Sequence, residues 1–274
     1  MQSTNSSQSA RVPGASADGS VHAPMGGPTR FTPYLSPLCN ARDLGGLPTT
    51  AGTETVRTRL IRSASPCLLT AADVDLLVDG VGIRTRIDLR SPRETIISPG
   101  SWTHRTDVGS HGLPFTEVEP PSAVGDPAEH IASAYLTYLR RSVDSVVRGI
   151  NIIARDDAAA VLIHCAGGKD RTGILVACLL DVLGVEHRAI VEDYARSANE
   201  LARTRRELAR LNLYQQRIGA IADRWGGASP EIMSAFLRQL GAEHGDSTAL
   251  LMAHGLTSET VDALRSRYLT TAAR

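Results

Sequence analysis

The sequence is poor in lysine and has no excess of charge of either sign. Lys169 is the single lysine among 29 basic residues, and 29 acidic residues balance them to a net charge of zero. A dedicated nucleic-acid-binding protein would be broadly basic, so this composition argues against one. Any site for an anion must therefore be local.

Cysteines and long hydrophobic runs are equally scarce. Four cysteines lie far apart without Cys-x-x-Cys spacing, which indicates neither a disulfide framework nor a zinc cluster. No apolar run approaches the roughly 18 residues that span a membrane, and the first residues lack the hydrophobic stretch of a signal peptide. We therefore expect a cytoplasmic protein that needs no metal or other cofactor, with export through an unrecognised signal left open.

Composition divides the chain into two parts. Residues 1–30 are rich in serine, glycine, alanine and proline, with almost no large apolar residues to offset the entropy of ordering, so we predict a disordered tail. Residues 31–274 are predicted to form a single domain, because 42% hydrophobic and 21% charged residues are ordinary for a globular protein. Within this domain, residues from about 187 to 228 are expected to form a helical insertion.

Hydrophobic periodicity predicts an α/β fold. The run "AAAVLIHC" at 158–165 is typical of a buried central strand, and "TGILVACLLDVLG" at 172–184 is typical of an apolar helix. Further strands are expected at 58–64 and 83–91, further helices at 70–82 and 127–154, and only helices from 187 onward. Together these elements predict a central, mainly parallel sheet flanked by helices, with extra helices towards the carboxyl terminus.

The lone lysine lies in the segment "HCAGGKDRTG", residues 164–173, at the turn between that strand and that helix. Five residues between a cysteine and an arginine suffice for the backbone to curl round one phosphate-sized anion, and two adjacent glycines permit the tight turn. Backbone N–H groups would form the anion nest, reinforced by the start of the helix. The predicted phosphate-binding residues are Ala166, Gly167, Gly168, Lys169, Asp170 and Arg171.

A nucleoside-triphosphate loop is excluded, because Ile163 stands where that motif needs glycine and Asp170 follows the lysine. At the base of the predicted nest, Cys165 would be surrounded by N–H dipoles and the positive Arg171, which favour a nucleophilic thiolate. Arg171 offers a planar fork for two phosphoryl oxygens. The residues therefore predict a cysteinyl-phosphate intermediate.

The segment resembles the signature of the cysteine-dependent protein tyrosine phosphatases. Lys169 with Asp170 narrows the resemblance to the bacterial branch typified by mycobacterial protein tyrosine phosphatase B, and "NARDLGGLPT" at 40–49 and "LIRSASPCLLT" at 60–70 are similar to further blocks of that branch. The chain departs from the pattern at Ala41, where an aromatic is usual, and at Gly167, where alanine is frequent.

The resemblance covers residues from about 31 to the carboxyl terminus and implies a tyrosine-phosphatase-like fold with a helical lid. It implies hydrolysis of phosphotyrosine, with phosphoserine, phosphothreonine and phosphoinositides as further candidate substrates. The expected partners are thus phosphorylated proteins or phosphoinositides, not nucleic acid, and no integral membrane segment is expected. Lys169 would add positive charge at the pocket mouth; alternatively, it only neutralises Asp170.

A leaving oxygen needs a proton from a nearby carboxyl group, and two candidates exist. Asp170 lies in the loop and is preferred, whereas Asp88 ends the strand at 83–91 and is either the acid or a structural partner of Arg90. His164 is expected to support the thiolate environment rather than carry a proton. Thr172 is expected to donate its hydroxyl to the Cys165 sulfur.

Two other function classes remain to be compared. A silent phosphate-binding module would be expected to lack Cys165, Arg171 or both candidate acids, and none of them is missing. An arsenate-reductase-like redox enzyme would need a resolving cysteine near Cys165, whereas Cys178 falls on the apolar helix and is expected to be a core residue.

Outside the loop, Arg42 and Asp43 are expected to brace the loop.

Overall fold

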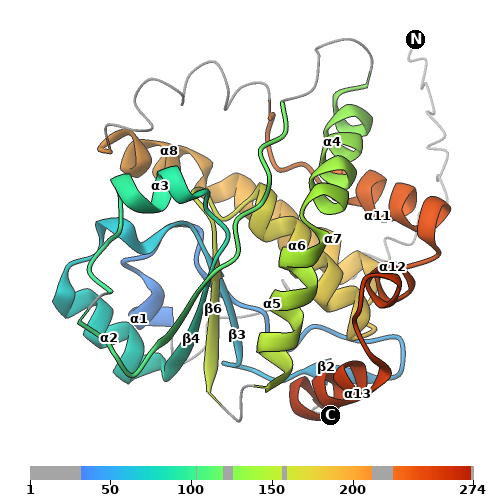
Figure 1. Ribbon diagram of the computed structural model, residues 1–274, viewed down its shortest axis with the longest axis horizontal. Helices are drawn as coiled ribbons and strands as arrows, with labels where there is room; N and C mark the ends of the chain where they lie inside the picture. Colours follow the sequence, from blue (N-terminus) through green and yellow to red (C-terminus); the bar gives the residue numbers. More distant parts are fainter. Residues whose placement is uncertain (1–31, 103, 120–125, 156–158, 212–224, 273–274) are drawn as a thin grey trace, which may run out of the picture.

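A computed structural model of the chain describes residues 32–102, 104–119, 126–155, 159–211 and 225–272 (Figure 1). The predicted disordered tail at 1–30 lies outside the described residues. So do residues 212–224 of the predicted insertion at 187–228. Of the remaining residues, 187–209 are helical and 225–228 are not.

A five-stranded sheet runs through the molecule. Its order is β1 (Arg42–Asp43), β3 (Leu60–Ser63), β6 (Ala160–His164), β4 (Ile83–Asp88) and β5 (Gly109–Gly112). Strands β3, β6, β4 and β5 are parallel, and only β1 pairs antiparallel at one edge of this sheet. The predicted mainly parallel sheet is therefore confirmed.

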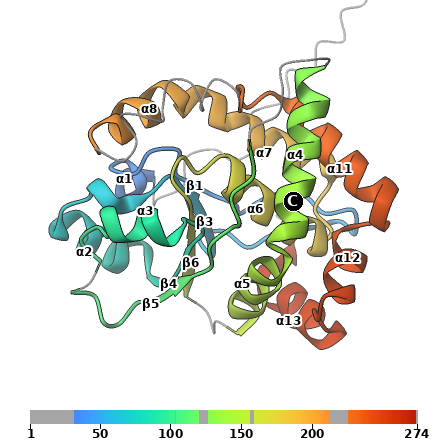
Figure 2. The same cartoon turned by 45° about the horizontal axis from the view of Figure 1, so that its top comes forward.

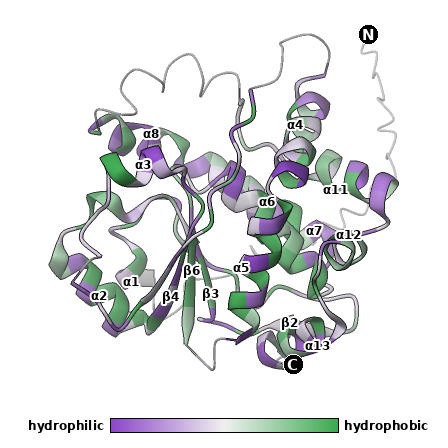
Figure 3. Ribbon diagram, in the orientation of Figure 1, coloured by the Kyte–Doolittle hydropathy of each residue, from purple (hydrophilic) through white to green (hydrophobic). Residues whose placement is uncertain are grey.

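The central strand β6 is buried on both faces, which explains its continuous apolar sequence. Val161 and Ile163 belong to the larger hydrophobic core, whereas Ala160 and Leu162 belong to a second core on the opposite face. This alternation follows from the two-residue period of a strand. In Figure 3, β6 is accordingly hydrophobic along most of its length.

Helices cover both faces of the sheet (Figures 1 and 2). The helices α1 (Thr32–Leu35) and α2 (Ala71–Val81) pack against the smaller core. The larger core is formed by α4 (Pro127–Arg141), α5 (Val143–Arg155), α6 (Asp170–Val182), α7 (His187–Ala195), α11 (Pro230–His244), α12 (Ser247–Ala253) and α13 (Ser258–Tyr268). Helix α4 packs against α11, and α13 packs against α5.

The remaining described helices are η1 (Pro66–Leu68), α3 (Pro92–Ile97), η2 (Arg196–Glu200) and α8 (Leu201–Ala209). Helices α3 and α8 both lie beyond the same end of the sheet (Figures 1 and 2). The chain enters α6 from β6 at this end, so these helices lie around the predicted loop. No helix within the described ranges is both long enough and apolar enough to cross a membrane.

Several predicted boundaries need correction. The strand expected at 83–91 ends at Asp88, because Ser91 and Glu94 form the capping box that starts α3. Strand β5 was not predicted, since "GSHG" has no hydrophobic alternation. The carboxyl-terminal region is not purely helical either, because β7 (Leu269–Thr271) pairs antiparallel with β2 (Thr53–Thr55).

Candidate active site

The predicted loop leaves the carboxyl end of β6 between two parallel neighbours. His164 pairs in register with Ser63 of β3 and with Asp88 of β4, so these three residues end their strands side by side. Cys165 follows directly, is 2% exposed, and lies at the start of the loop. Helix α6 begins at Asp170, which gives the expected strand–loop–helix arrangement.

Hydrogen bonds hold the loop carbonyls away from its centre. The carbonyls of Ala166, Gly167 and Gly168 accept bonds from the Ser65 amide (2.8 Å), the Asn40 side-chain amide (3.0 Å) and the Arg62 guanidinium (2.8 Å). In a trans peptide the N–H points opposite to the carbonyl, so the amides that follow point to the other side. Within the described part of the chain, the amides of residues 166–169 have no hydrogen-bond partner. This is the backbone geometry of an anion nest.

Gly168 is required by the closeness of the loop to β3. Its φ is +67°, and a Cβ at this position would come within 2.4 Å of the Ser63 backbone. Gly167 has no such restriction, because a Cβ there would meet only the Thr204 methyl group, at 3.9 Å. The departure from the family pattern at Gly167 is therefore sterically neutral.

Arg171 is oriented by Glu94, which was not among the predicted site residues. Nη1 and Nη2 of Arg171 donate to Oε2 and Oε1 of Glu94 at 2.6 and 2.9 Å. Burial would lower the pKa of Arg171, but Glu94 and the nearby Cys165 hold it well above the ordinary value. The available signal was the Ser91-x-x-Glu94 capping pattern, which indicates a helix start but not the second partner of its carboxylate.

Asp170 lies at the first position of α6, with its side chain 29% exposed. The Tyr135 hydroxyl donates to its Oδ1 at 2.6 Å, and Nζ of Lys169 lies 3.2 Å from the same oxygen. Tyr135 comes from α4 and was not among the predicted site residues. In the sequence it is an ordinary apolar-face residue of a helix, so nothing local marks it.

Lys169 is buried rather than open to the pocket mouth. It is 5% exposed, and its Nζ donates to the backbone carbonyls of Trp225, Gly226 and Gly227, each at 3.0 Å. With Asp170 it therefore has four oxygen partners. In this structure the ammonium is held by the protein, as in the alternative that ties it to Asp170, and is not a free cation for substrate.

Asp88 is engaged by a neighbouring arginine. Its carboxylate oxygens accept bonds from Nε and Nη2 of Arg90 at 2.9 and 2.7 Å, and the residue is 4% exposed. Burial would raise the pKa of Asp88, but His164 and Arg90 hold it below its usual value. These contacts match the structural alternative foreseen for Asp88.

His164 is completely buried beside Asp88, with Nε2 3.8 Å from its Oδ2. Burial lowers the pKa of His164 to about 4, although Asp88 opposes the shift, so the imidazole is neutral at pH 7. The Thr172 hydroxyl is buried and has no hydrogen-bond partner among the described residues. The expected bond from Thr172 to the Cys165 sulfur is therefore not formed here, although the hydroxyl has no competing partner.

A buried charge cluster supports the loop from behind. Arg62 donates to the Gly168 carbonyl and to Oδ2 of Asp193, and Arg42 donates to Oδ1 of the same carboxylate at 2.6 Å. The bracing by Arg42 is thus indirect, through Asp193 and through Asn40, whose Oδ1 accepts from Arg42 at 2.7 Å. Asp43 does not reach the loop, because its carboxylate accepts bonds from the amides at positions 45 and 58.

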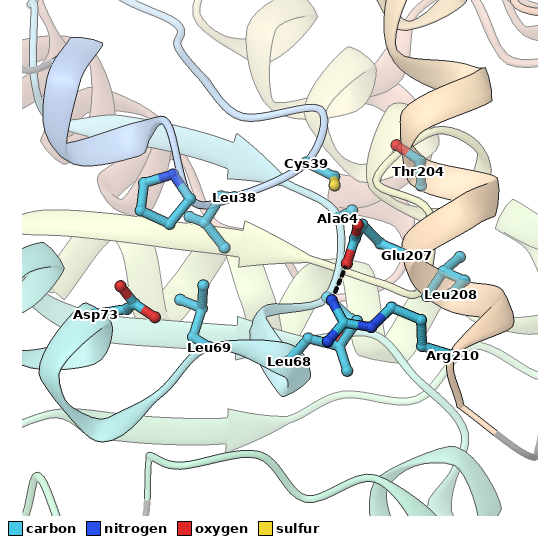
Figure 4. A pocket seen from close by; sticks show the side chains of 12 residues that line it. Leu38, Cys39, Ala64, Leu68, Leu69, Asp73, Thr204, Glu207, Leu208 and Arg210 are labelled. Atoms are coloured by element: carbon cyan, nitrogen blue, oxygen red, sulfur yellow. Dashed lines mark hydrogen bonds and ion pairs between the residues drawn. The ribbon is translucent and has the colours of Figure 1, made fainter.

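A small pocket borders the loop on the side of α8 (Figure 4). Its walls come from α8 and from the segments at 37–39 and 64–69, and include Cys39 and Thr204. Glu207 and Arg210 form an ion pair at 2.7 Å across one side of it. Because the Ser65 amide donates to the Ala166 carbonyl, pocket and loop share a wall.

Comparison with known proteins adds independent information. A tyrosine-protein phosphatase of Nostoc commune is 35% identical over 144 residues, which cover 52% of this chain and 49% of the relative. The triple specificity protein phosphatase PtpB of Mycobacterium tuberculosis is 29% identical, with 68% of this chain and 82% of the relative covered. Among solved structures, the core catalytic domain of the yeast PP-IP phosphatase SIW14 covers 62% of this chain and 91% of its own, at 16% identity and a TM-score of 0.34.

This chain therefore spans about half the length of the Nostoc relative. The family model described as "Tyrosine phosphatase family" matches residues 34–270, which is most of the 274-residue chain. The chain belongs to the tyrosine phosphatase family.

Proposed function

We propose that the protein is a cysteine-dependent phosphatase that hydrolyses phosphotyrosine, with phosphoserine, phosphothreonine and phosphoinositides as further substrates. The observation that carries this proposal is the loop after Cys165, where the carbonyls of residues 166–168 accept bonds from outside the loop while Arg171 is held in a fixed orientation. Such a loop presents N–H groups and a guanidinium to a phosphoryl group. The names of the relatives support the same substrate class.

The proposed reaction has two displacements. The Cys165 sulfur attacks phosphorus, the bond from phosphorus to the ester oxygen breaks, and a carboxyl group gives its proton to the departing oxygen. Water then attacks the cysteinyl phosphate, the phosphorus–sulfur bond breaks, and the carboxylate takes the proton of the water. Arg171 and the loop amides bind the equatorial oxygens throughout both steps.

We propose Asp170 as the proton carrier and Asp88 as a structural residue. Asp170 is partly exposed beside the loop, so its carboxyl group is accessible to a leaving oxygen. Asp88 is buried, and Arg90 occupies both of its oxygens. Because its pKa is held below the usual value, Asp88 is harder to protonate than an ordinary carboxyl group.

The redox alternative has less support. Cys178 lies in the hydrophobic core on α6, and burial raises the pKa of its thiol to about 12. A thiol that stays protonated is a poor resolving group. The predicted cytoplasmic location and the absence of nucleic-acid partners stay predictions from the sequence.

The test of the proposed function uses Cys165→Ser. This variant should lose turnover of a phosphotyrosine peptide and still bind inorganic vanadate or phosphate, because the nest is intact. Substantial turnover in the variant would contradict the covalent mechanism. Assays of the wild-type protein on phosphotyrosine peptide, phosphoserine peptide and phosphoinositides, with and without EDTA, would rank the substrates and test whether a metal is needed.

A further inference from the structure

Two buried tyrosine hydroxyls form a chain of hydrogen bonds that ends at Asp170. The Tyr135 oxygen is 2.6 Å from Oδ1 of Asp170 and 2.8 Å from the Tyr194 oxygen. A phenol has one hydrogen, and a carboxylate only accepts. Tyr135 therefore donates to Asp170, and Tyr194 donates to Tyr135.

The ring of Tyr135 is fixed by its surroundings. Tyr135 has no exposed surface, and its ring lies 6.1 Å from the rings of Trp225 and Phe236, stacked on the first and edge-on to the second. Burial also raises the pKa of Tyr135 well above its ordinary value, so the hydroxyl keeps its hydrogen. The donor to Asp170 is thus permanent in both position and protonation.

The Tyr135 hydroxyl and the Lys169 ammonium both contact the same oxygen of Asp170, the first as a hydrogen-bond donor and the second as an ion pair. Nζ of Lys169 is 3.2 Å from Oδ1, the atom that also accepts from Tyr135. Lys169 is itself fixed by the carbonyls of residues 225–227. Within the described part of the chain, no group donates a hydrogen bond to Oδ2 of Asp170.

We propose that Tyr135 is a positioning residue for the acid: together with Lys169 it holds Oδ1, so that Oδ2 gives the proton to the leaving oxygen and takes it back from water. Tyr194 supports Tyr135 as a second donor in the chain. This inference rests on the proposed function, with Asp170 as the acid. The hydrogen bond from Tyr135 and the charge of Lys169 beside Oδ1 also stabilise the carboxylate that remains once the proton has left.

The test compares substrates with good and poor leaving groups. Tyr135→Phe keeps the stacked ring and removes only the hydroxyl that holds Oδ1. We expect turnover of an alkyl phosphate, which depends on the acid, to fall about 10-fold or more, and turnover of an activated aryl phosphate to fall about 3-fold or less. Tyr194→Phe keeps the hydrogen bond from Tyr135 to Asp170. We therefore expect it to change the ratio of the two turnover rates in the same direction, but by less.

A matched control is Tyr268→Phe. The Tyr268 hydroxyl is equally buried and donates to the Ile153 carbonyl at 3.0 Å, in the contact between α13 and α5. Its loss should lower thermal stability by a similar amount and leave the ratio of the two turnover rates unchanged. A role of Tyr135 in packing alone would give this same pattern.

Asp170→Asn separates failure of the inference from failure of the proposed acid. The amide oxygen can still accept from Tyr135, and Lys169 keeps its three carbonyl partners, so this variant should stay folded and lose turnover of the alkyl phosphate selectively. When Asp170→Asn is already present, adding Tyr135→Phe should not change the ratio of the two turnover rates any further. Suppose that Asp170→Asn lowers mainly alkyl phosphate turnover, whereas Tyr135→Phe affects both substrates equally or not at all. The inference about Tyr135 is then overturned, and Asp170 remains the acid. If Asp170→Asn lowers both turnover rates equally, the assignment of Asp170 as the acid is wrong and the inference falls with it.

Discussion

The guanidinium of Arg171 and the carboxylate of Glu94 meet at two points, with distances of 2.6 and 2.9 Å. Because both groups are planar, two parallel hydrogen bonds fix the plane of the guanidinium. The same carboxylate accepts a bond from the Ser91 amide at 2.7 Å, which anchors it to the start of α3. Glu94 therefore determines which N–H groups of Arg171 remain for the proposed contact with a phosphoryl group.

Replacing Glu94 should lower activity without removing a reactive group. For Glu94→Ala we expect kcat/KM to fall by about 10- to 100-fold, because Arg171 loses a charge-assisted pair and its fixed orientation. Steady-state kinetics on an aryl phosphate would measure this loss. Ser91→Ala is the matched control: it removes the side-chain cap of α3, costs about 1 kcal/mol of stability, and should keep most of the activity. Equal losses in both variants would assign Glu94 to the cap alone.

The two loop glycines should respond very differently to the same added methyl group. Gly168→Ala places a Cβ against the Ser63 backbone at a φ of +67°, so we expect a loss of at least about 2 kcal/mol of unfolding free energy and most of the activity. Gly167→Ala meets only an ordinary contact and should change either quantity little. Urea unfolding and turnover of both variants would test this difference, and a tolerant Gly168→Ala would contradict the described loop.

Lys169 should act on stability rather than on substrate choice. In Lys169→Met the three carbonyls at residues 225–227 lose a charged donor, so we expect the free energy of unfolding to fall by about 2–4 kcal/mol. Turnover of a simple alkyl phosphate and of a multiply phosphorylated inositol lipid, which have similar leaving groups, should fall equally, independent of salt, because the ammonium is buried. Arg210→Met, at an exposed cation beside the pocket, should have little effect on stability. A loss confined to the inositol lipid that shrinks with rising salt would instead support substrate contact by Lys169.

Acid should destabilise the protein through His164. Its pKa is about 4 in the folded protein and near 6.5 when unfolded, so the fold favours the neutral ring. The contribution of His164 to the free energy of unfolding is complete above pH 6.5. It is lost as the pH falls towards 4, by at most about 3 kcal/mol. Urea unfolding at pH 7 and pH 5 should show a shallower pH dependence for His164→Asn than for the wild type. Identical dependence in both would show that His164 does not titrate in this range.

Local sequence determined the elements whose causes are local. The capping box of Thr70 and Asp73 starts α2, and the apolar run at 158–165 forms β6, because these features involve neighbours along the chain or simple burial. The short strands β5 and β7 could not be predicted in the same way. Their residues carry no alternation, and they are strands only because a partner strand lies beside them.

The sequence by itself determined the family resemblance and the position of the loop. It also determined the choice of Cys165 as candidate nucleophile and of Arg171 as candidate phosphate-binding residue, because the predicted chemistry needs a fixed spacing within ten residues. Only the tertiary structure decided what surrounds those residues. Glu94 lies 77 positions from Arg171, Tyr135 lies 35 from Asp170, and the Trp225 carbonyl lies 56 from Lys169. Such partners depend on how α3, α4 and the segment before α11 pack around one end of the sheet, and no periodicity along the chain encodes which polar atom of a buried helix face will meet another.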